Sequence, residues 1–367
     1  MMEYKKYKWS DVLIIINGRN QNAVECEDGE YPIYGSGGVM GKANDYLCPP
    51  NCTIIGRKGN INKPIFVETK FWNVDTAFGL SANEEFLNPR YLYYFCVDYN
   101  FERHNKAVTI PSLTKADLLK IEMCLPTLNK QKSIVEELDK INELIRLKKE
   151  QLKDYDNLAQ SIFYEMFGDP VENEKGWEER TMQDLCVNIV DCPHSTPKKV
   201  DYITDYPCIR TSELRGGSIS WATMQYLDED EYNIRIARLK PEAGDIVFGR
   251  EGTIGDAVIL PLGYNFSLGQ RTMLLRADTS IVSNIFLHRI ILSDWIRHQI
   301  EYVNVSSTVA HVNIKDFKKF TVPLPPLQLQ QVFASRITQI EALKAEVQRT
   351  ISDLETLLAS RMQYWFD

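Results

Sequence analysis

The sequence lacks several features that would place the protein in familiar classes. Its 367 residues contain no run of about 18 apolar residues, so no membrane span is predicted. The first ten residues, MMEYKKYKWS, have no apolar core of signal-peptide length. No G-x-G-x-x-G or Walker sequence follows a predicted strand, which argues against a nucleotide site. These absences predict a cytoplasmic protein that binds no nucleotide cofactor.

Patterns that carry catalysis or metal binding are also missing. None of the eight cysteines forms a C-x-x-C pair, so they are read as reduced cytoplasmic thiols. Cys192 and His194 are close in sequence, but no second ligand pair completes a zinc site. Glu68 and Lys70 have the spacing of a metal-dependent nuclease motif without the upstream aspartate that it needs. We therefore predict no catalytic residue and no metal in this chain.

No segment of the chain is basic. The net charge is −8, and acidic residues outnumber basic ones in each of the segments 1–126, 127–168, 169–326 and 327–367. A nucleic-acid binder with a wholly basic surface is thereby excluded. If the protein binds DNA, it must use local clusters or take positive charge from a partner. The hydrophobic content of 44% is that of a soluble globular protein, and the length allows two domains.

The sequence contains an internal repeat, in which one unit occurs twice. The stretches IIGRKGNIN and VFGREGTIG share a Gly-Arg-x-Gly-x-Ile sequence, and their arginines, Arg57 and Arg250, are 193 positions apart. A Tyr-Pro pair recurs at a shift of 175. LPTLNKQ and LPPLQLQ begin at Leu125 and Leu324, and from there the shift stays at 199. Two copies of domain size predict two globular heads, each followed by a tail of fixed length, and exclude a solenoid.

Each tail predicts one long helix. Apolar residues recur at alternating spacings of three and four over about 40 residues, or about 60 Å, and both tails share the same register. Such a seam predicts that the two helices pack together as a coiled coil, antiparallel if a two-fold axis relates the copies. The alternative is that each helix packs only on its own head. The seam includes Ile134, Leu138, Ile141, Ile145, Leu152, Ile337, Ile340, Ile351, Leu354 and Leu358.

The heads predict mixed α/β domains, because short strand-like runs broken by turns alternate with helical stretches. The expected fold class is α+β or mixed α/β, with two pseudo-two-fold-related heads separated by two long antiparallel coiled-coil helices. The second head contains an insertion, since 24 positions separate Pro32 from Gly56 and 42 separate Pro207 from Gly249. The expected boundaries are residues 1–126 and 169–326 for the heads, and 127–168 and 327–367 for the helices.

Loops rich in glycine, hydroxyl and basic residues are the candidate DNA contacts. Glycine permits a sharp turn, and an arginine beside it can fork onto a phosphate or a guanine edge. The alternative is a tight turn with a surface arginine. The candidates are Tyr34, Ser36, Lys42, Arg57, Lys58 and Asn60 in the first head, and His194, Thr196, Lys198, Arg210, Arg215, Arg250 and Thr253 in the second.

Taken together, these motifs resemble the specificity subunit of type I restriction–modification systems, the HsdS family, over essentially the whole chain. The first head is similar to the family's YPxYGSxG…GRKGxI…FWxxDT type. The second head is similar to the DGxHxTP…GRxGTxG type, with Cys192 where the family usually has glycine.

The resemblance implies a subunit that binds double-stranded DNA at a bipartite site through two target-recognition domains. It implies that two methyltransferase subunits dock on the helices, for which the ten seam residues are the candidates, and that restriction subunits join them. S-adenosylmethionine, ATP and Mg²⁺ are expected in those partners, and no cofactor is expected in this chain.

Two other classes stay open at this point. One is a coiled-coil scaffold that presents two protein-binding heads, which sequence-specific and salt-dependent DNA binding would exclude. The other is a DNA-modifying enzyme with an unrecognised site, against which the missing motifs argue.

Overall fold

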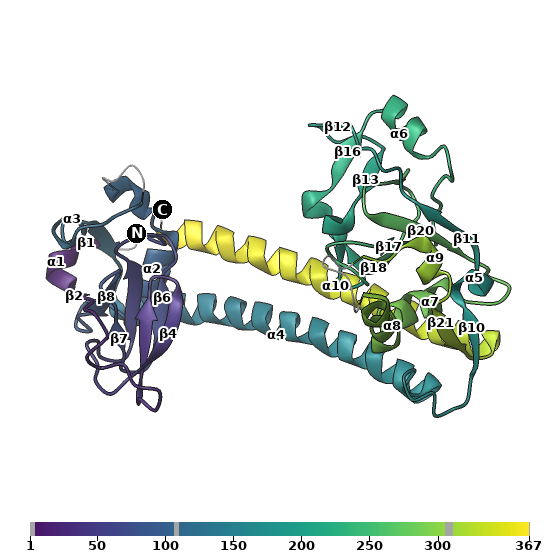
Figure 1. Ribbon diagram of the computed structural model, residues 1–367. Coiled ribbons are helices and arrows are strands. Elements are labelled where there is room, and N and C mark those ends of the chain that lie inside the picture. Colours follow the sequence, from purple (N-terminus) through teal and green to yellow (C-terminus); the bar gives the residue numbers. More distant parts are fainter. Residues whose placement is uncertain (1–3, 106–109, 305–310, 367) are drawn as a thin grey trace. The chain divides into compact units, whose positions relative to one another are not determined.

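The computed structural model describes residues 4–105, 110–304 and 311–366 (Figure 1). It consists of two compact units, unit 1 with residues 1–151 and 347–367 and unit 2 with residues 152–346. Each of the two long helices, α4 (Leu128–Phe167) and α10 (Leu327–Phe366), gives one half to each unit. No helix in the described ranges is both long and apolar enough to span a membrane.

Unit 1 is built around short, mostly antiparallel strands. They are β1 (Lys5–Lys8), β2 (Leu13–Asn17), β3 (Tyr31–Gly35), β4 (Gly38–Ala43), β5 (Cys52–Gly56), β6 (Ile65–Val67), β7 (Trp72–Asn73), β8 (Ala77–Ala82) and β9 (Glu122–Leu125). The central antiparallel sheet has the order β2-β8-β5-β6, and every residue of β5 is buried. A second sheet, β4-β3-β7, contains the parallel pair β3–β7, and β1 pairs with β9.

The helices of unit 1 close the core on the central sheet. They are α1 (Trp9–Val12), α2 (Pro89–Asp98), the 3-10 helix η1 (Phe101–His104) and α3 (Lys115–Leu118). Helix α2 begins where Asn88 accepts hydrogen bonds from the N–H groups of Arg90 and Tyr91 and where Pro89 takes the first helical position. Ile134 of α4 and Met362 of α10 lie in the same buried cluster as Trp9, so the helix halves are part of this core.

Unit 2 repeats this construction. Its strands are β10 (Glu178–Thr181), β11 (Cys186–Asp191), β12 (Lys199–Val200), β13 (Pro207–Ile209), β14 (Leu214–Arg215), β15 (Ser218–Ile219), β16 (Gln225–Leu227), β17 (Ile246–Gly249), β18 (Ala257–Ile259), β19 (Ser267–Leu268), β20 (Thr272–Ala277) and β21 (Thr321–Leu324). The antiparallel sheet β11-β20-β17-β18 matches β2-β8-β5-β6 strand for strand. The parallel pair β13–β19 matches β3–β7, and β10–β21 matches β1–β9.

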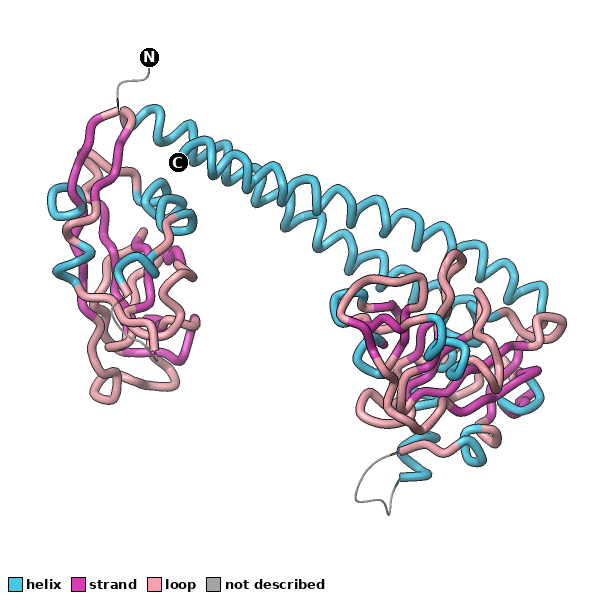
Figure 2. The backbone as a smooth tube through the Cα atoms, turned by 90° about the horizontal axis from the view of Figure 1, so that it is seen from above, coloured by secondary structure: helices cyan, strands magenta, loops and turns pink. Residues whose placement is uncertain are grey.

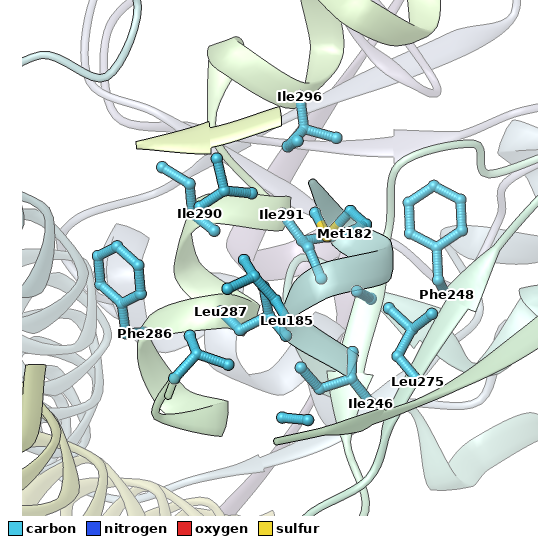
Figure 3. Packing of buried hydrophobic residues seen from close by; sticks show 14 of the residues in the cluster. Met182, Leu185, Ile246, Phe248, Leu275, Phe286, Leu287, Ile290, Ile291 and Ile296 are labelled. Carbon is cyan, nitrogen blue, oxygen red and sulfur yellow. The ribbon is translucent and has the colours of Figure 1, made fainter. Parts of the chain in front are cut away.

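The helices of unit 2 also follow the pattern of unit 1. They are α5 (Met182–Leu185), η2 (Thr211–Glu213), η3 (Trp221–Thr223), α6 (Glu229–Arg235), α7 (Asn284–Ile291), α8 (Asp294–Asn304) and α9 (Ile314–Phe317). Figure 3 shows their core, in which Phe286 and Leu287 of α7 lie near Leu185 of α5 and Ile246 of β17. Between β13 and β17, unit 2 carries the hairpin β14–β15, strand β16 and helix α6, where unit 1 has only β4. The predicted insertion in the second head is therefore present.

Within each unit the two long helices run antiparallel. In unit 1, Glu137 of α4 pairs with Arg361 of α10, and Lys149 further along α4 pairs with Glu355, earlier in α10, at 2.8 Å. In unit 2, Asp156 pairs with Lys344 at 2.8 Å, whereas Phe163 contacts Phe333 with ring centroids 5.7 Å apart. Figures 1 and 2 show the helices side by side. The predicted fold class, with two related α/β domains and two long antiparallel helices, is confirmed.

The seam packs within the chain. Seven of the ten predicted docking residues are buried and the other three are half-buried. Little of their side-chain surface is therefore open to a second protein, and the docking of partners on these residues stays a prediction. The buried residues are Ile134, Leu138, Ile141, Ile145, Ile337, Ile340 and Ile351, and the half-buried ones are Leu152, Leu354 and Leu358.

Candidate nucleic-acid interface

The repeated Gly-Arg-x-Gly loop begins at the end of the buried strand β5 in unit 1 and of β17 in unit 2. The first glycine is required because the loop folds back: a Cβ on Gly56 would lie 2.3 Å from the carbonyl oxygen of Asn60, and a Cβ on Gly249 would lie 2.6 Å from that of Thr253. The second glycine has a φ of +78° at Gly59 and +77° at Gly252. Both glycines are thus required by the backbone conformation of the turn, and the arginine lies between them.

The same backbone hydrogen bonds hold both loops. The Arg57 N–H donates to the carbonyl oxygen of Thr76 at 2.8 Å, and the Arg250 N–H donates to that of Arg271 at 2.8 Å. The arginine carbonyl oxygens accept from the N–H groups of Leu113 and Val312, at 2.9 and 3.1 Å. Leu113 and Val312 are 199 positions apart, so both backbone hydrogen bonds of the loop arginine are duplicated.

The two arginine side chains differ in their surroundings. The Arg250 side chain is 13% exposed, forms an ion pair with Asp191, and donates from Nε to the carbonyl oxygen of Val312 at 2.8 Å. Its guanidinium therefore ties two loops together, which differs from the expected DNA contact. Arg57 is half-buried and donates weakly to the carbonyl oxygen of Asp75, at 3.5 Å.

A single substitution accounts for this difference. Asp191 lies opposite Met273 in its sheet, and the corresponding strand pair in unit 1 places Asn17 opposite Phe78. Asn17 is therefore the counterpart of Asp191, and a neutral amide stands where unit 2 has a carboxylate. No ion pair of Arg57 occurs within the described parts of the chain, so its charge is available to a ligand.

In unit 2, a buried arginine fixes the loop that follows β11. Arg235, whose side chain is fully buried, donates to the carbonyl oxygens of Leu268 at 2.8 Å and of Pro193 and Ser195 at 3.2 Å. This loop carries His194, whose carbonyl oxygen accepts from the Gln270 side chain at 2.8 Å. The loop is thus held rigidly from below, as a positioned binding group requires.

These contacts bring part of the predicted set together. A cavity of about 190 Å³ is lined by His194 and Arg250 together with Cys192, Glu251, Gln270 and Arg271. Burial raises the pKa of the Cys192 thiol. The backbone N–H of Cys192 donates to the carbonyl oxygen of Thr272, so this residue is part of the core. Thr253 adjoins this site by donating to the carbonyl oxygen of Thr211 at 3.1 Å.

In unit 1, Tyr34 lies on the same framework as the Arg57 loop. Its carbonyl oxygen accepts from the Val74 N–H at 2.9 Å, next to the turn that holds Arg57, but its ring packs on Phe71. Ser36 is half-buried in the following turn, and Lys42 pairs with Pro32 at the far end of the β3–β4 hairpin. Tyr34 and Ser36 therefore adjoin the loop, whereas Lys42 does not.

The other predicted contacts fall into two groups. Lys58, Asn60, Thr196, Lys198 and Arg215 are exposed. Arg210 is engaged within its own unit, because it donates to the fully buried Glu213 at 2.7 Å and to the carbonyl oxygen of Thr223 at 2.9 Å. Its guanidinium therefore holds the inserted segment of unit 2 in place.

Three residues of the site have no place in the sequence-based set: Arg235, Gln270 and Arg271. Arg235 lies in the insertion, which has no counterpart in the first head and so offered no repeat to compare. Gln270 and Arg271 stand where unit 1 has Asp75 and Thr76, as the shared hydrogen bonds show. The aspartate and threonine belong to a motif noted in the first head, so an alignment by strand would have found the position.

Over the described ranges, no group of three or more histidine, cysteine, aspartate or glutamate side chains is arranged to hold a metal ion. The candidate interface is instead a set of loops with exposed polar and basic side chains. Their backbones are fixed and their tips face solvent, which suits contacts to the phosphates and base edges of a duplex.

Comparison with known proteins gives this geometry a context. The family model "Type I restriction modification DNA specificity domain" matches residues 1–154 and 174–355. The specificity subunit of the type I restriction enzyme MjaVIII from Methanocaldococcus jannaschii is 20% identical over 296 residues, covering 76% of this chain and 69% of that protein. The EcoBI specificity subunit from Escherichia coli is 21% identical over 342 residues, covering 84% and 70%.

A solved structure shows the same fold. The crystal structure of the S subunit of a type I restriction–modification system from M. genitalium matches with a TM-score of 0.65 and 13% sequence identity. The match covers 100% of this chain and 96% of that one. At this identity the likeness concerns the fold, and both units take part in it.

Proposed function

The chain belongs to the family of type I restriction–modification DNA specificity proteins, and we propose from this membership that each unit reads one half of a bipartite DNA site. The protein is the DNA sequence-recognition subunit of a larger complex and does no chemistry itself. Methyl transfer and cleavage belong to the methyltransferase and restriction subunits, together with S-adenosylmethionine, ATP and Mg²⁺. We further propose that the complex works in the cytoplasm.

The observation that carries this proposal is the duplicated loop frame. Both units present a Gly-Arg-x-Gly turn on equivalent hydrogen bonds, yet the surrounding side chains differ. Two copies of one scaffold with different side chains suit two different base sequences, because base edges are read by side chains while backbone contacts carry no sequence information. A scaffold that binds only proteins would not require the Gly-Arg-x-Gly turn to have the same geometry in both units.

The methyltransferase subunits need a surface other than the buried seam. Five leucines on the helices are 44–46% exposed, and four of them are duplicated: Leu144 and Leu343 are 199 positions apart, as are Leu158 and Leu357, whereas Leu147 has Glu346 as its counterpart. Leu144 and Leu357 immediately precede the seam residues Ile145 and Leu358, so they lie at the edge of the helix pair.

Each unit contains one such pair, with one leucine from each helix. The ion pairs of Glu137 and Lys149 with α10 enclose Leu144 and Leu357 in unit 1. Two equivalent exposed leucine pairs suit two copies of one partner, since exposed apolar groups that recur at matched places indicate interfaces. We therefore assign methyltransferase docking to these leucines.

The deciding experiment expresses the chain together with its methyltransferase partner and maps methylated bases across a genome. The expected result is one bipartite sequence with a fixed gap. Methylation at every occurrence of a short undivided sequence would contradict two half-sites. Methyl transfer by the purified chain alone would instead support the enzyme class, and a complex with no sequence preference would support the scaffold.

A further inference from the structure

We propose that Arg271 is the side chain with which unit 2 reads a base of its half-site, and that this base is a guanine. The inference rests on the proposed function and names one contact within it. It identifies a specificity-determining residue that the motifs of the sequence do not indicate.

Arg271 has an equivalent in unit 1, Thr76. Thr76 in unit 1 and Arg271 in unit 2 accept the same hydrogen bond, from the N–H of the repeated-loop arginine, at the same distance of 2.8 Å. This backbone hydrogen bond is therefore shared between the units, whereas the side chain differs and so does φ, which is positive at Arg271 and not at Thr76. This is the behaviour expected of a reading position when two heads share a scaffold and recognise different sequences.

The backbone conformation of Arg271 itself is unusual for an arginine. Its φ is +66°, in the left-handed region that glycine adopts without strain and that other residues rarely enter. An arginine in this conformation is held there by its surroundings, and such residues are concentrated at functional sites. The side chain is 63% exposed, and its one ion pair in the described parts of the chain is with Glu251, at 3.1 Å.

This ion pair is easily exchanged for DNA. The Glu251 side chain is itself 40% exposed, and ion pairs between exposed side chains contribute little because water and salt screen them. The guanidinium can therefore leave Glu251 and donate two parallel hydrogen bonds to O6 and N7 of a guanine, which is the commonest specific contact that arginine makes in the major groove.

The other arginine of the cavity, Arg250, is already engaged within unit 2. The Arg250 guanidinium is committed to Asp191 and to the carbonyl oxygen of Val312, and 13% of its side chain is exposed. To reach DNA it would have to leave a largely buried carboxylate, whose other side-chain partner is the exposed His194 at 3.3 Å. Arg250 thus holds the frame, and the charge that faces solvent is that of Arg271.

The turn that carries Arg271 is anchored to two other segments of unit 2. The Gly269 N–H donates to the carbonyl oxygen of Ile209 at 2.7 Å, and the Gln270 side chain donates to that of His194 at 2.8 Å. Gln270 is therefore a positioning residue. Fixing the backbone in this way leaves only the rotamers of Arg271 to be ordered on binding, which favours discrimination between bases.

The experiment uses the complete complex with its methyltransferase partner. Methylated sequences are mapped for Arg271→Ala, Arg271→Lys and a matched control, Arg297→Ala. Arg297 is 64% exposed and pairs with Asp294 at 2.8 Å, so it has the same exposure and the same kind of ion pair as Arg271.

Arg271→Ala is expected to relax one G·C pair in one half-site by about 5- to 150-fold, while the other half-site is unchanged. Arg271→Lys is expected to relax the same pair, because lysine keeps the charge and loses the fork. The control is expected to leave both half-sites as they are.

Two results would overturn the inference. One is an unchanged methylated sequence in Arg271→Ala. The other is a uniform loss of methylation that Arg271→Lys restores, which would show a phosphate contact. Because glycine suits the backbone at this position, Arg271→Gly keeps the protein folded and must show the same relaxation as Arg271→Ala. If the unaltered complex methylates no bipartite sequence, the proposed function itself fails.

Discussion

Gln131 and Gln330, 199 positions apart, join helix to domain in the same way in both units. Each is fully buried, and each side-chain oxygen accepts at 2.8 Å from the N–H of the residue that caps α2 or α7, Asn88 or Ser283. Each side-chain nitrogen donates to the proline carbonyl oxygen just before its own long helix, at 2.9 Å from Gln131 and 2.7 Å from Gln330. The pair therefore fixes the start of each long helix against its domain.

Removing either glutamine should destabilise its unit. Gln131→Ala and Gln330→Ala each leave a buried N–H and buried carbonyl groups without partners, at about 1–3 kcal/mol for each such group. We expect a loss of about 2–4 kcal/mol in the free energy of unfolding, measured by urea denaturation. The exposed Gln328→Ala is the control and should change stability by less than about 0.5 kcal/mol. Equal stability of the three variants would show that the link contributes nothing.

The two repeated arginines should respond differently to mutation. Arg250→Ala removes the arginine partner of the Asp191 carboxylate, which is 18% exposed and keeps the exposed His194 at 3.3 Å, and should cost about 2–4 kcal/mol of stability after allowance for that exposure. Arg57→Ala strands no carboxylate and should change stability by less than about 1 kcal/mol. It should instead weaken discrimination in one half-site by about 1–3 kcal/mol if Arg57 contacts a base. Thermal unfolding and methylation mapping separate the two effects, and matching behaviour of both variants would refute the distinction.

Charging the exposed leucines should remove partner subunits one at a time. Leu144→Glu is expected to leave one methyltransferase subunit bound where the unaltered chain binds two, and Leu144→Glu with Leu343→Glu is expected to leave none. Mass measurement of the purified complexes counts the subunits. Leu262→Glu changes a leucine that is 87% exposed and lies outside the helices, so it should retain both subunits. Two bound subunits in the double variant would rule out this surface.

Unit 2 should lose stability in mild acid because of His288. Burial lowers the pKa of His288 from 6.5 to about 4, and its Nε2–H donates to the carbonyl oxygen of Ala257 at 2.9 Å. Between these two values the unfolded chain binds a proton that the folded chain does not, so stability falls as the pH drops from about 6.5 towards about 4. The full loss is on the order of 3 kcal/mol.

The pH effect can be assigned by substitution. His288→Gln keeps an N–H donor for Ala257 and has no titrating group, so its unfolding free energy should vary less over this pH range. His298→Gln, at an exposed position, should retain the pH dependence of the unaltered protein. Identical curves for all three proteins would exclude His288 as the source.

Lengthening both helices by one heptad should change the gap between the half-sites. Seven residues inserted after Leu147 and after Glu346 keep the same face of each helix buried and add about 10 Å to each. Because a duplex advances about 3.4 Å per base pair, the gap should grow by up to roughly three base pairs. The half-site sequences should stay the same, because the loops are untouched. Methylation that persists at the original gap would show that the helices do not set it.

The architecture was open to prediction because its signals are periodic and repeated. The constant shift of 199 and the seam from Ile134 onward predict paired helices, since burial of an apolar stripe leaves few alternatives. The division of labour between Arg57 and Arg250 could not be predicted. It depends on whether the residue at the end of the paired strand is Asn17 or Asp191. That residue is distant from the arginine in sequence, and only the pairing of strands brings the two together.

The same reasoning applies to the docking surface. A seam that is apolar in sequence can pack within the chain or against a partner, and periodicity does not distinguish the two. In the structure Leu138 and Ile337 are buried, whereas Leu144 of α4 is exposed. Arg271 was missed for a related reason, because its left-handed backbone and its exposure are properties of a turn that short motifs do not encode.

The division of the long helices between the units also sets an order of assembly during synthesis. Unit 2 is one continuous stretch, residues 152–346, whereas unit 1 is completed only by residues from 347 onward. Phe366 contacts Tyr91 with ring centroids 5.1 Å apart, so part of the core of unit 1 is supplied by a residue that is made after the whole of unit 2. On the ribosome, where domains generally fold as units, the second unit can finish folding before the first, although translation starts with the first. A nascent chain released before its final helical turns would carry a finished second unit and a first unit with an open core, exposed to aggregation and proteolysis.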